Sequence, residues 1–69
     1  MSGKTITVNG RNVSWSDGMT VQTVLDVMNY TFRLLVVKVN GRLVKKEEYK
    51  TFKVPENSDV KVIHMVAGG

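Results

Sequence analysis

Residues 34–44 read LLVVKVNGRLV, an apolar run followed by Asn40-Gly41 and a second, shorter apolar run. Asn-Gly is the strongest short-range signal for a hairpin, because a type I′ turn needs a positive φ at both central residues. The nearly continuous apolar run before the turn is typical of a central strand, covered on one face and partly covered on the other. The stretch therefore predicts a β-hairpin in the middle of a sheet.

A second Asn-Gly pair, Asn9-Gly10, predicts another hairpin near the start of the chain. Polar and apolar residues alternate on both sides of it. The apolar positions are Ile6, Val8, Val13 and Trp15. A period of two is expected of strands with one buried face. We expect Trp15 at the margin of the core, with its indole N–H bonded to a partner.

One helix is predicted between the hairpins. Its apolar stripe has the spacing i, i+3, i+4, i+7 and consists of Val21, Val24, Leu25 and Met28. Thr20 is the expected N-cap, and Met19 before it can pack on Val24 as a hydrophobic staple. Asn29 can adopt the left-handed conformation that ends a helix.

The last third of the chain predicts a connection, a turn and a final strand. Residues 45–53 mix lysines with Glu47 and Glu48, and we expect them to form an exposed connection anchored by Tyr49 and Phe52. Residues 56–59 form a turn, and residues 60–66 form the last strand. The expected order is β-β-α-β-β-β. The predicted core comprises Ile6, Val8, Val13, Val24, Leu25, Met28, Leu35, Val37, Val60 and Val62.

Composition restricts the function. With 69 residues, 42% of them hydrophobic, and a net charge of +4, the chain is expected to fold as one small soluble domain. The absence of cysteine excludes disulfides, thiolate catalysis and Cys-based metal sites, and a single histidine, His64, excludes a multi-histidine site within one chain. We expect His64 to be a surface residue. No catalytic or metal-ligating residue is predicted, so a binding module or a carrier is the expected class rather than an enzyme.

The chain ends in Ala67-Gly68-Gly69 directly after the last predicted strand. Two glycines without a Cβ make a thin arm that can thread a narrow channel and present a free carboxylate. We therefore expect a domain over residues 1–66 and a flexible tail over residues 67–69. The N-terminus has no apolar signal region, so a cytoplasmic location is expected.

The chain resembles the ThiS-type sulfur carriers of thiamin biosynthesis, in the ubiquitin-like β-grasp family that also includes the molybdopterin carriers. The resemblance rests on residues 6–10, 18–21, 37–41 and 66–69. It implies an α+β fold with a mixed sheet of about five strands and one helix across one face. One departure is the turn before the last strand, where the family usually has Asp-Gly-Asp and this chain has Asn57-Ser58-Asp59. That departure puts the local turn in question.

The resemblance also implies a reaction cycle and its partners. Gly69 would be adenylated by an E1-like, ThiF-type enzyme that uses ATP and magnesium, while the chain itself binds no cofactor. A persulfide protein such as a cysteine desulfurase would supply sulfur, giving a thiocarboxylate that a ThiG-type thiazole synthase accepts. The expected partner-binding patch consists of Val36, Ile63 and Met65, because alternation points these side chains away from the helix.

Other interpretations remain open. Carriers for molybdopterin synthesis or tRNA thiolation, and prokaryotic protein modifiers, would have a similar sequence, although molybdopterin carriers are usually longer and often have prolines before the Gly-Gly. A freestanding RNA-binding module like the TGS domains would suit a pI of about 9.7 and the helix entry at residues 18–21. Such a module has no use for a terminal Gly-Gly, so nucleic acid is not the expected partner. A membrane is not expected either, because no apolar run approaches the ~20 residues that a membrane helix needs.

Overall fold

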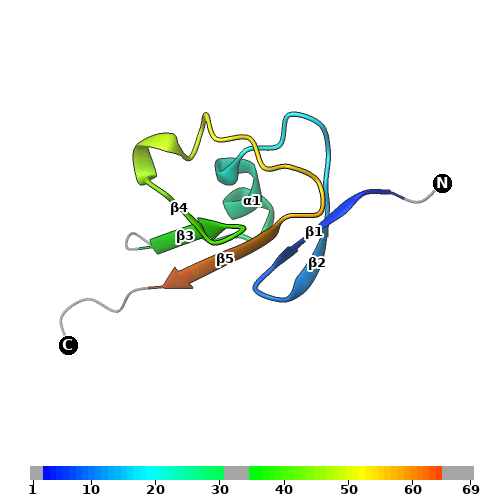
Figure 1. Cartoon of the computed structure of the whole chain (residues 1–69), viewed down its shortest axis with the longest axis horizontal. Coiled ribbons are helices and arrows are strands. Elements are labelled where there is room, and N and C mark those ends of the chain that lie inside the picture. The colour runs from blue at the N-terminus through cyan, green and yellow to red at the C-terminus, as the bar shows by residue number, and fades with distance from the viewer. Residues whose placement is uncertain (1–2, 31–34, 65–69) are drawn as a thin grey trace.

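The computed structural model describes residues 3–30 and 35–64 (Figure 1). These residues form a five-stranded mixed sheet in the order β2-β1-β5-β3-β4, with one α-helix lying across one face. The elements are β1 (Thr5–Val8), β2 (Arg11–Ser14), α1 (Val21–Val27), β3 (Leu35–Val39), β4 (Arg42–Val44), the 3-10 helix η1 (Lys46–Glu48) and β5 (Asp59–His64). The predicted element order and fold class are confirmed.

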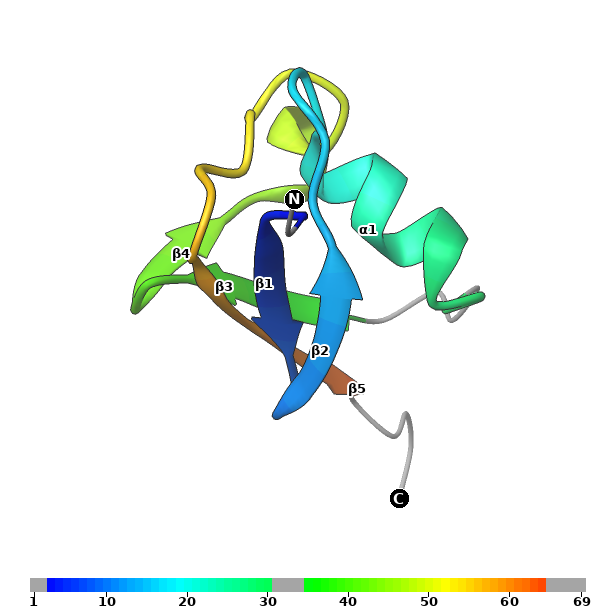
Figure 2. The same ribbon diagram turned by 90° about the vertical axis from the view of Figure 1, so that its right-hand side faces the viewer.

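Strand β5 is the last strand in the sequence and the middle strand of the sheet (Figure 2). It pairs in parallel with β1, where Val8 is opposite Val60. It pairs in antiparallel fashion with β3, from Leu35 opposite His64 to Val39 opposite Val60. The two hairpins, β1–β2 and β3–β4, are therefore joined into one sheet by β5.

Both predicted Asn-Gly turns form as expected. The φ angles are 52° at Asn9 and 84° at Gly10, and 51° at Asn40 and 83° at Gly41. These positive values satisfy the requirement of a type I′ turn. The Asn-Gly dipeptides therefore located both hairpins correctly.

The side chains of the two turn asparagines also hold β5. The Asn9 side chain accepts a hydrogen bond from the Val62 N–H at 2.9 Å and donates one to the Val62 carbonyl at 3.1 Å. The Asn40 side chain accepts from the Asp59 N–H at 2.9 Å and donates to Ser58 Oγ at 3.3 Å. We call these two contacts the asparagine clamps. They attach β5 to the hairpin turns on both of its sides.

The helix begins with the predicted cap. Thr20 Oγ1 accepts from the Thr23 N–H, and Thr23 Oγ1 accepts from the Thr20 N–H, both at 3.3 Å, forming a reciprocal capping box. Met19 is buried in the same core cluster as Val24, as a hydrophobic staple requires. Asn29 follows the helix with φ 60°, which confirms the predicted end.

The predicted core is confirmed. Six of its members are buried, and Val13, Met28, Leu35 and Val62 are partly buried against them. The structure adds six buried residues to this core: Met19, Val21, Val39, Val44, Tyr49 and Val54. Of these, Val21 was predicted in the apolar stripe of the helix, Met19 in the staple and Tyr49 as an anchor. Trp15 lies at the margin, as expected, and its Nε1–H donates to the Val54 carbonyl at 2.6 Å.

The segment before β5 is more ordered than the prediction of an exposed connection suggests. It contains η1, and Tyr49 and Phe52 anchor it to the core as predicted. In the turn that follows, Asn57 takes φ 62°, and Ser58 is buried with its hydroxyl donating to the Pro55 carbonyl at 2.6 Å. The Asn57-Ser58-Asp59 sequence therefore makes a well-bonded turn in spite of its departure from the family pattern.

Candidate functional site

The end of β5 is the part of the fold that leads to the predicted tail. Ala67, Gly68 and Gly69 lie outside the described residues, as does Met65 of the predicted patch. The structure describes how the strand reaches this point. His64, the last residue of β5, is opposite Leu35 of β3 and is exposed at the surface, as predicted.

The strand is held on both sides just before it ends. Val62 is clamped by the Asn9 side chain on one side and is opposite Val37 of β3 on the other. Residues 65–69 can reach at most about 18 Å beyond His64, because an extended residue spans no more than ~3.6 Å. An active site that acts on Gly69 must therefore lie within about that distance of the end of β5.

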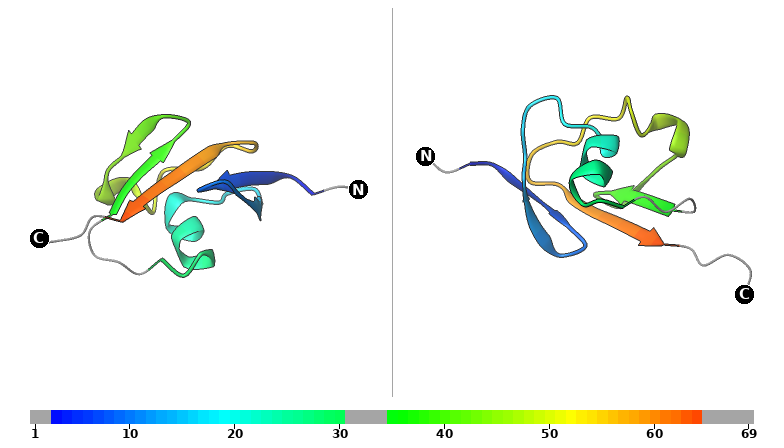
Figure 3. Two further views of the ribbon diagram at one scale, coloured as in Figure 1. Left: turned by 90° about the horizontal axis from the view of Figure 1, so that it is seen from below. Right: turned by 180° about the vertical axis from the view of Figure 1, so that it is seen from behind.

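The sheet face opposite the helix carries two of the predicted patch residues side by side. Val36 is directly opposite Ile63 in the β3–β5 ladder. Ile63 is 47% exposed and Val36 is partly buried. The helix lies on the other side of the sheet (Figure 3). The structure thus brings Val36 and Ile63 together on one surface.

Leu43 of β4 belongs to the same face and was not predicted. It is 54% exposed and is opposite Lys38 of β3. Its neighbour Val44 is buried, so strict alternation along β4 would have indicated that Leu43 points outward. Among the described residues, the exposed large apolar side chains are Val27 on α1 and Leu43 and Ile63 on this face.

Two lysines are neighbours of these apolar side chains on the same face of the sheet. Lys38 and Lys61 are directly opposite each other in the β3–β5 ladder. Lys61 Nζ is 4.0 Å from an Asp59 carboxylate oxygen, and both side chains are more than half exposed. We call the surface formed by Val36, Lys38, Leu43, Lys61 and Ile63 the outer sheet face. It combines apolar and basic side chains.

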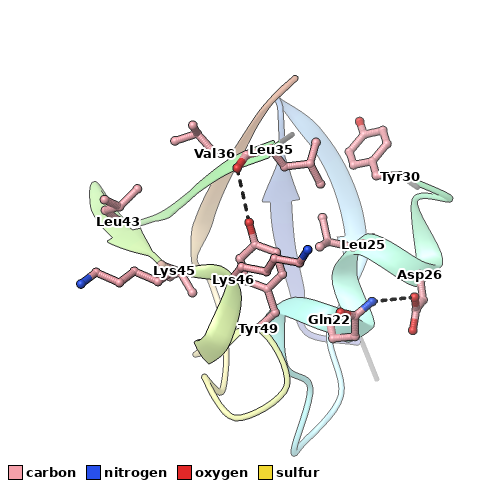
Figure 4. A pocket seen from close by; sticks show the side chains of 11 residues that line it. Gln22, Leu25, Asp26, Tyr30, Leu35, Val36, Leu43, Lys45, Lys46 and Tyr49 are labelled. Atoms are coloured by element: carbon pink, nitrogen blue, oxygen red, sulfur yellow. Dashed lines mark hydrogen bonds between the residues drawn. The ribbon is translucent and has the colours of Figure 1, made fainter. Parts of the chain in front are cut away.

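A groove of about 460 Å³ lies at the β4 edge of the sheet, between α1, the start of β3 and the β4–η1 segment, and Val36 and Leu43 of the outer sheet face also line it (Figure 4). Leu25, Tyr30, Leu35 and Tyr49 line it, and the Tyr49 hydroxyl is 3.5 Å from the Leu35 carbonyl oxygen. Burial raises the pKa of Tyr49 above its usual value.

Within residues 3–30 and 35–64, no group of three or more histidine, aspartate or glutamate side chains could hold a metal ion. No helix in this part of the chain is long and apolar enough to cross a membrane. The candidate site consists of the end of β5 and the outer sheet face, where Val36 and Ile63 lie directly opposite each other.

Comparison with known proteins agrees with this geometry. The model of the ThiS family matches residues 3–69. The chain belongs to the ThiS family. The match extends from just before β1 to Gly69, so it includes the tail that the sequence singled out.

Two ThiS proteins illustrate the relationship. The sulfur carrier protein ThiS of Bacillus subtilis (strain 168) is 27% identical over 63 residues, which make up 90% of this chain and 96% of the relative. The crystal structure of the thiamine biosynthesis protein ThiS from Geobacter metallireducens has a TM-score of 0.72 at 25% identity, covering 94% of this chain and 99% of that one. The predicted family and the ubiquitin-like β-grasp fold are confirmed.

Proposed function

We propose that the chain is a sulfur carrier for thiamin biosynthesis, in which the Gly69 carboxylate is the carrier group. The observation that supports this most strongly is the ThiS family match, which reaches Gly69 at the end of the chain. We propose no catalytic role for the chain's own side chains. The cycle would run in the cytoplasm, with a thiazole synthase as the sulfur acceptor.

The chemistry of the carboxylate explains why partners are needed. A terminal carboxyl group has a pKa of about 3.5, so at neutral pH it is ionised and resists nucleophilic attack. An E1-like enzyme with ATP and magnesium would convert it to an acyl adenylate and release pyrophosphate. The terminal sulfur of a donor persulfide would then displace AMP. Cleavage of the resulting S–S bond by a thiol would leave the thiocarboxylate on Gly69.

The test of this proposal is the intact mass of the chain. After incubation with ATP, magnesium, the adenylating enzyme and a persulfide donor, the mass should rise by the difference between sulfur and oxygen. Deleting Gly69 should abolish the change. Gly68→Val should also block it, because a β-branched side chain stiffens and widens the arm. Full thiocarboxylate yield from the Gly69 deletion would refute the proposal, and binding of RNA without any mass change would favour the TGS-like alternative.

We propose that Val36, Ile63 and Met65 form the surface on which the adenylating enzyme sits. Exposed apolar side chains that gather in one patch often mark an interface. Val36 and Ile63 lie next to the end of β5, and the reach of the tail requires the enzyme to approach that end. Ile63→Asp should weaken binding while the fold is kept, since Ile63 is 47% exposed. Unchanged affinity in a folded Ile63→Asp variant would exclude the patch.

A further inference from the structure

Lys38 and Lys61 are an unfavourable pair within the fold. Residues directly opposite each other on one face have Cβ atoms about 5 Å apart, and like charges in this position destabilise a sheet. The compensating acid is Asp59, whose carboxylate is 4.0 Å from Lys61 and also accepts a hydrogen bond from Thr7 Oγ1 at 3.0 Å. No other described carboxylate forms an ion pair with either lysine. The positive charge of the outer sheet face is therefore only partly compensated and lowers the stability of the folded sheet.

The position of the lysine pair relates it to the end of β5. The pair Val36 and Ile63 lies two residues from the lysine pair along the same two strands, a separation of about 7 Å. The lysine pair, the apolar pair and the start of the tail therefore follow one another along β5. A protein that holds the tail and covers Ile63 would also meet Lys38 and Lys61.

We propose that Lys38 and Lys61 are an electrostatic docking pair, which the adenylating enzyme meets with carboxylate side chains while Val36, Leu43 and Ile63 provide apolar contact. This rests on the proposed function, because it is the need to activate Gly69 that brings the enzyme to this end of the sheet. Charge complementarity of this kind steers encounter and fixes the register of an interface. The repulsion in the free carrier is relieved when the complex forms.

A protein is a better match to this surface than a nucleic acid. Single-stranded nucleic acids are bound by basic grooves with aromatic side chains on which the bases stack. The aromatic side chains of the described residues, Trp15, Tyr30, Tyr49 and Phe52, belong to the core or pack against it. The outer sheet face offers aliphatic side chains between its lysines, which suit an apolar protein surface with acidic flanks.

The proposal predicts opposite effects of one substitution on stability and on binding. Lys38→Glu places a carboxylate opposite Lys61 and replaces repulsion with a cross-strand ion pair. The variant should unfold at the same or a higher urea concentration than the wild type. It should bind the adenylating enzyme more weakly, because a negative charge now faces the enzyme's carboxylates. A purely structural role for the lysines would not produce this combination.

The matched control is Lys50→Glu. Lys50 is exposed on the connection beyond η1, away from the outer sheet face. Its replacement by glutamate changes the net charge of the chain by the same amount as Lys38→Glu. Affinity for the adenylating enzyme would be measured by calorimetry at low and high sodium chloride, using the full-length chain. At low salt we expect Lys38→Glu to lose about tenfold or more in affinity, and Lys50→Glu to stay near the wild type. The salt dependence of binding should be steeper for the wild type than for Lys38→Glu.

The outcomes separate this inference from the proposed function. Equal affinities for Lys38→Glu and Lys50→Glu would overturn the docking pair, even if the wild type is adenylated normally. Failure of the wild type to be adenylated would instead overturn the proposed function. If Lys38→Glu folds poorly, Lys38→Gln provides the test, and an unchanged salt dependence in that variant would also refute the docking pair. RNA binding that Lys38→Glu abolishes would identify a different partner for this face and overturn the proposal.

Discussion

Replacing Asn9 with glycine should destabilise the protein through the loss of one asparagine clamp. Glycine accepts the positive φ of 52° at this position, so the hairpin turn itself is preserved. The substitution removes the two hydrogen bonds to the Val62 backbone at 2.9 and 3.1 Å, and a longer one to the Tyr30 hydroxyl at 3.4 Å. A net 0.5–1.5 kcal/mol for each of the two short bonds gives about 1–3 kcal/mol. Because Asn9 is exposed, we expect the lower half of that range.

Asn57→Gly is the matched control for this prediction. Asn57 also has a positive φ, 62°, and its side chain forms no hydrogen bond with another described residue. The gain in unfolded-state entropy on introducing glycine is common to both variants, so their difference isolates the clamp. Chemical denaturation should show Asn9→Gly to be less stable than Asn57→Gly by about 1–2 kcal/mol, or roughly 4–16 °C in Tm. Hydrogen exchange at the Val62 amide should accelerate only in Asn9→Gly. Equal stabilities of the two variants would show that the clamp contributes nothing and would refute the reasoning.

Three further predictions concern the core and its margin. Leu25→Ala should lower the unfolding free energy by about 2–5 kcal/mol, because the Leu25 side chain is only 3% exposed on the buried face of α1. An unchanged urea midpoint would contradict the assignment of Leu25 to the core. Trp15→Phe should lower the unfolding free energy by about 1–3 kcal/mol, because the Val54 carbonyl loses the indole N–H that bonds it at 2.6 Å. A denaturation curve that matches the wild type would argue against a contribution from that bond. Because the pKa of Tyr49 is raised in the folded state, its contribution to stability is complete below pH ~10 and is lost as the pH rises through the folded-state pKa. The unfolding free energy of Tyr49→Phe should therefore fall less steeply above pH ~10 than that of the wild type. Identical dependence on pH in the two proteins would exclude Tyr49 as the origin of the effect.

Local patterns in the sequence were sufficient for most of the fold. The Asn-Gly dipeptides determine φ, the apolar stripe of α1 determines its buried face, and alternation in β3 and β5 separates the core from the outer sheet face. These signals act within a few residues, so they can be recognised without the rest of the chain. Val36 and Ile63 were placed on one face by the same reasoning, and the β3–β5 register has them directly opposite.

The features that sequence reasoning missed depend on partners far away in the chain. Asn9 was assigned to a turn, but its side chain bonds a strand 53 residues later. Val54 is buried within a segment that has no periodicity, since it is held there by a bridge between Thr20 and Lys53 and by Trp15. That Lys38 lies opposite Lys61 can be predicted only when the register between β3 and β5 is known, and no local sequence pattern determines that register. Tertiary pairing, rather than propensity, decides each of these.

The central position of β5 has a consequence for how the protein is made. The β1–β2 and β3–β4 hairpins each consist of neighbouring segments and can form as soon as they are synthesised, but neither pairs with the other. Strand β5 lies between the two hairpins and is synthesised after both of them. A nascent chain without residues 59–64 therefore exposes the unpaired edges of β1 and β3, which can associate with other chains. The closing contacts have long sequence separation, and such contacts slow folding. Because the same strand closes the sheet and leads to Gly69, the sheet is complete only when the strand that carries the tail is in place.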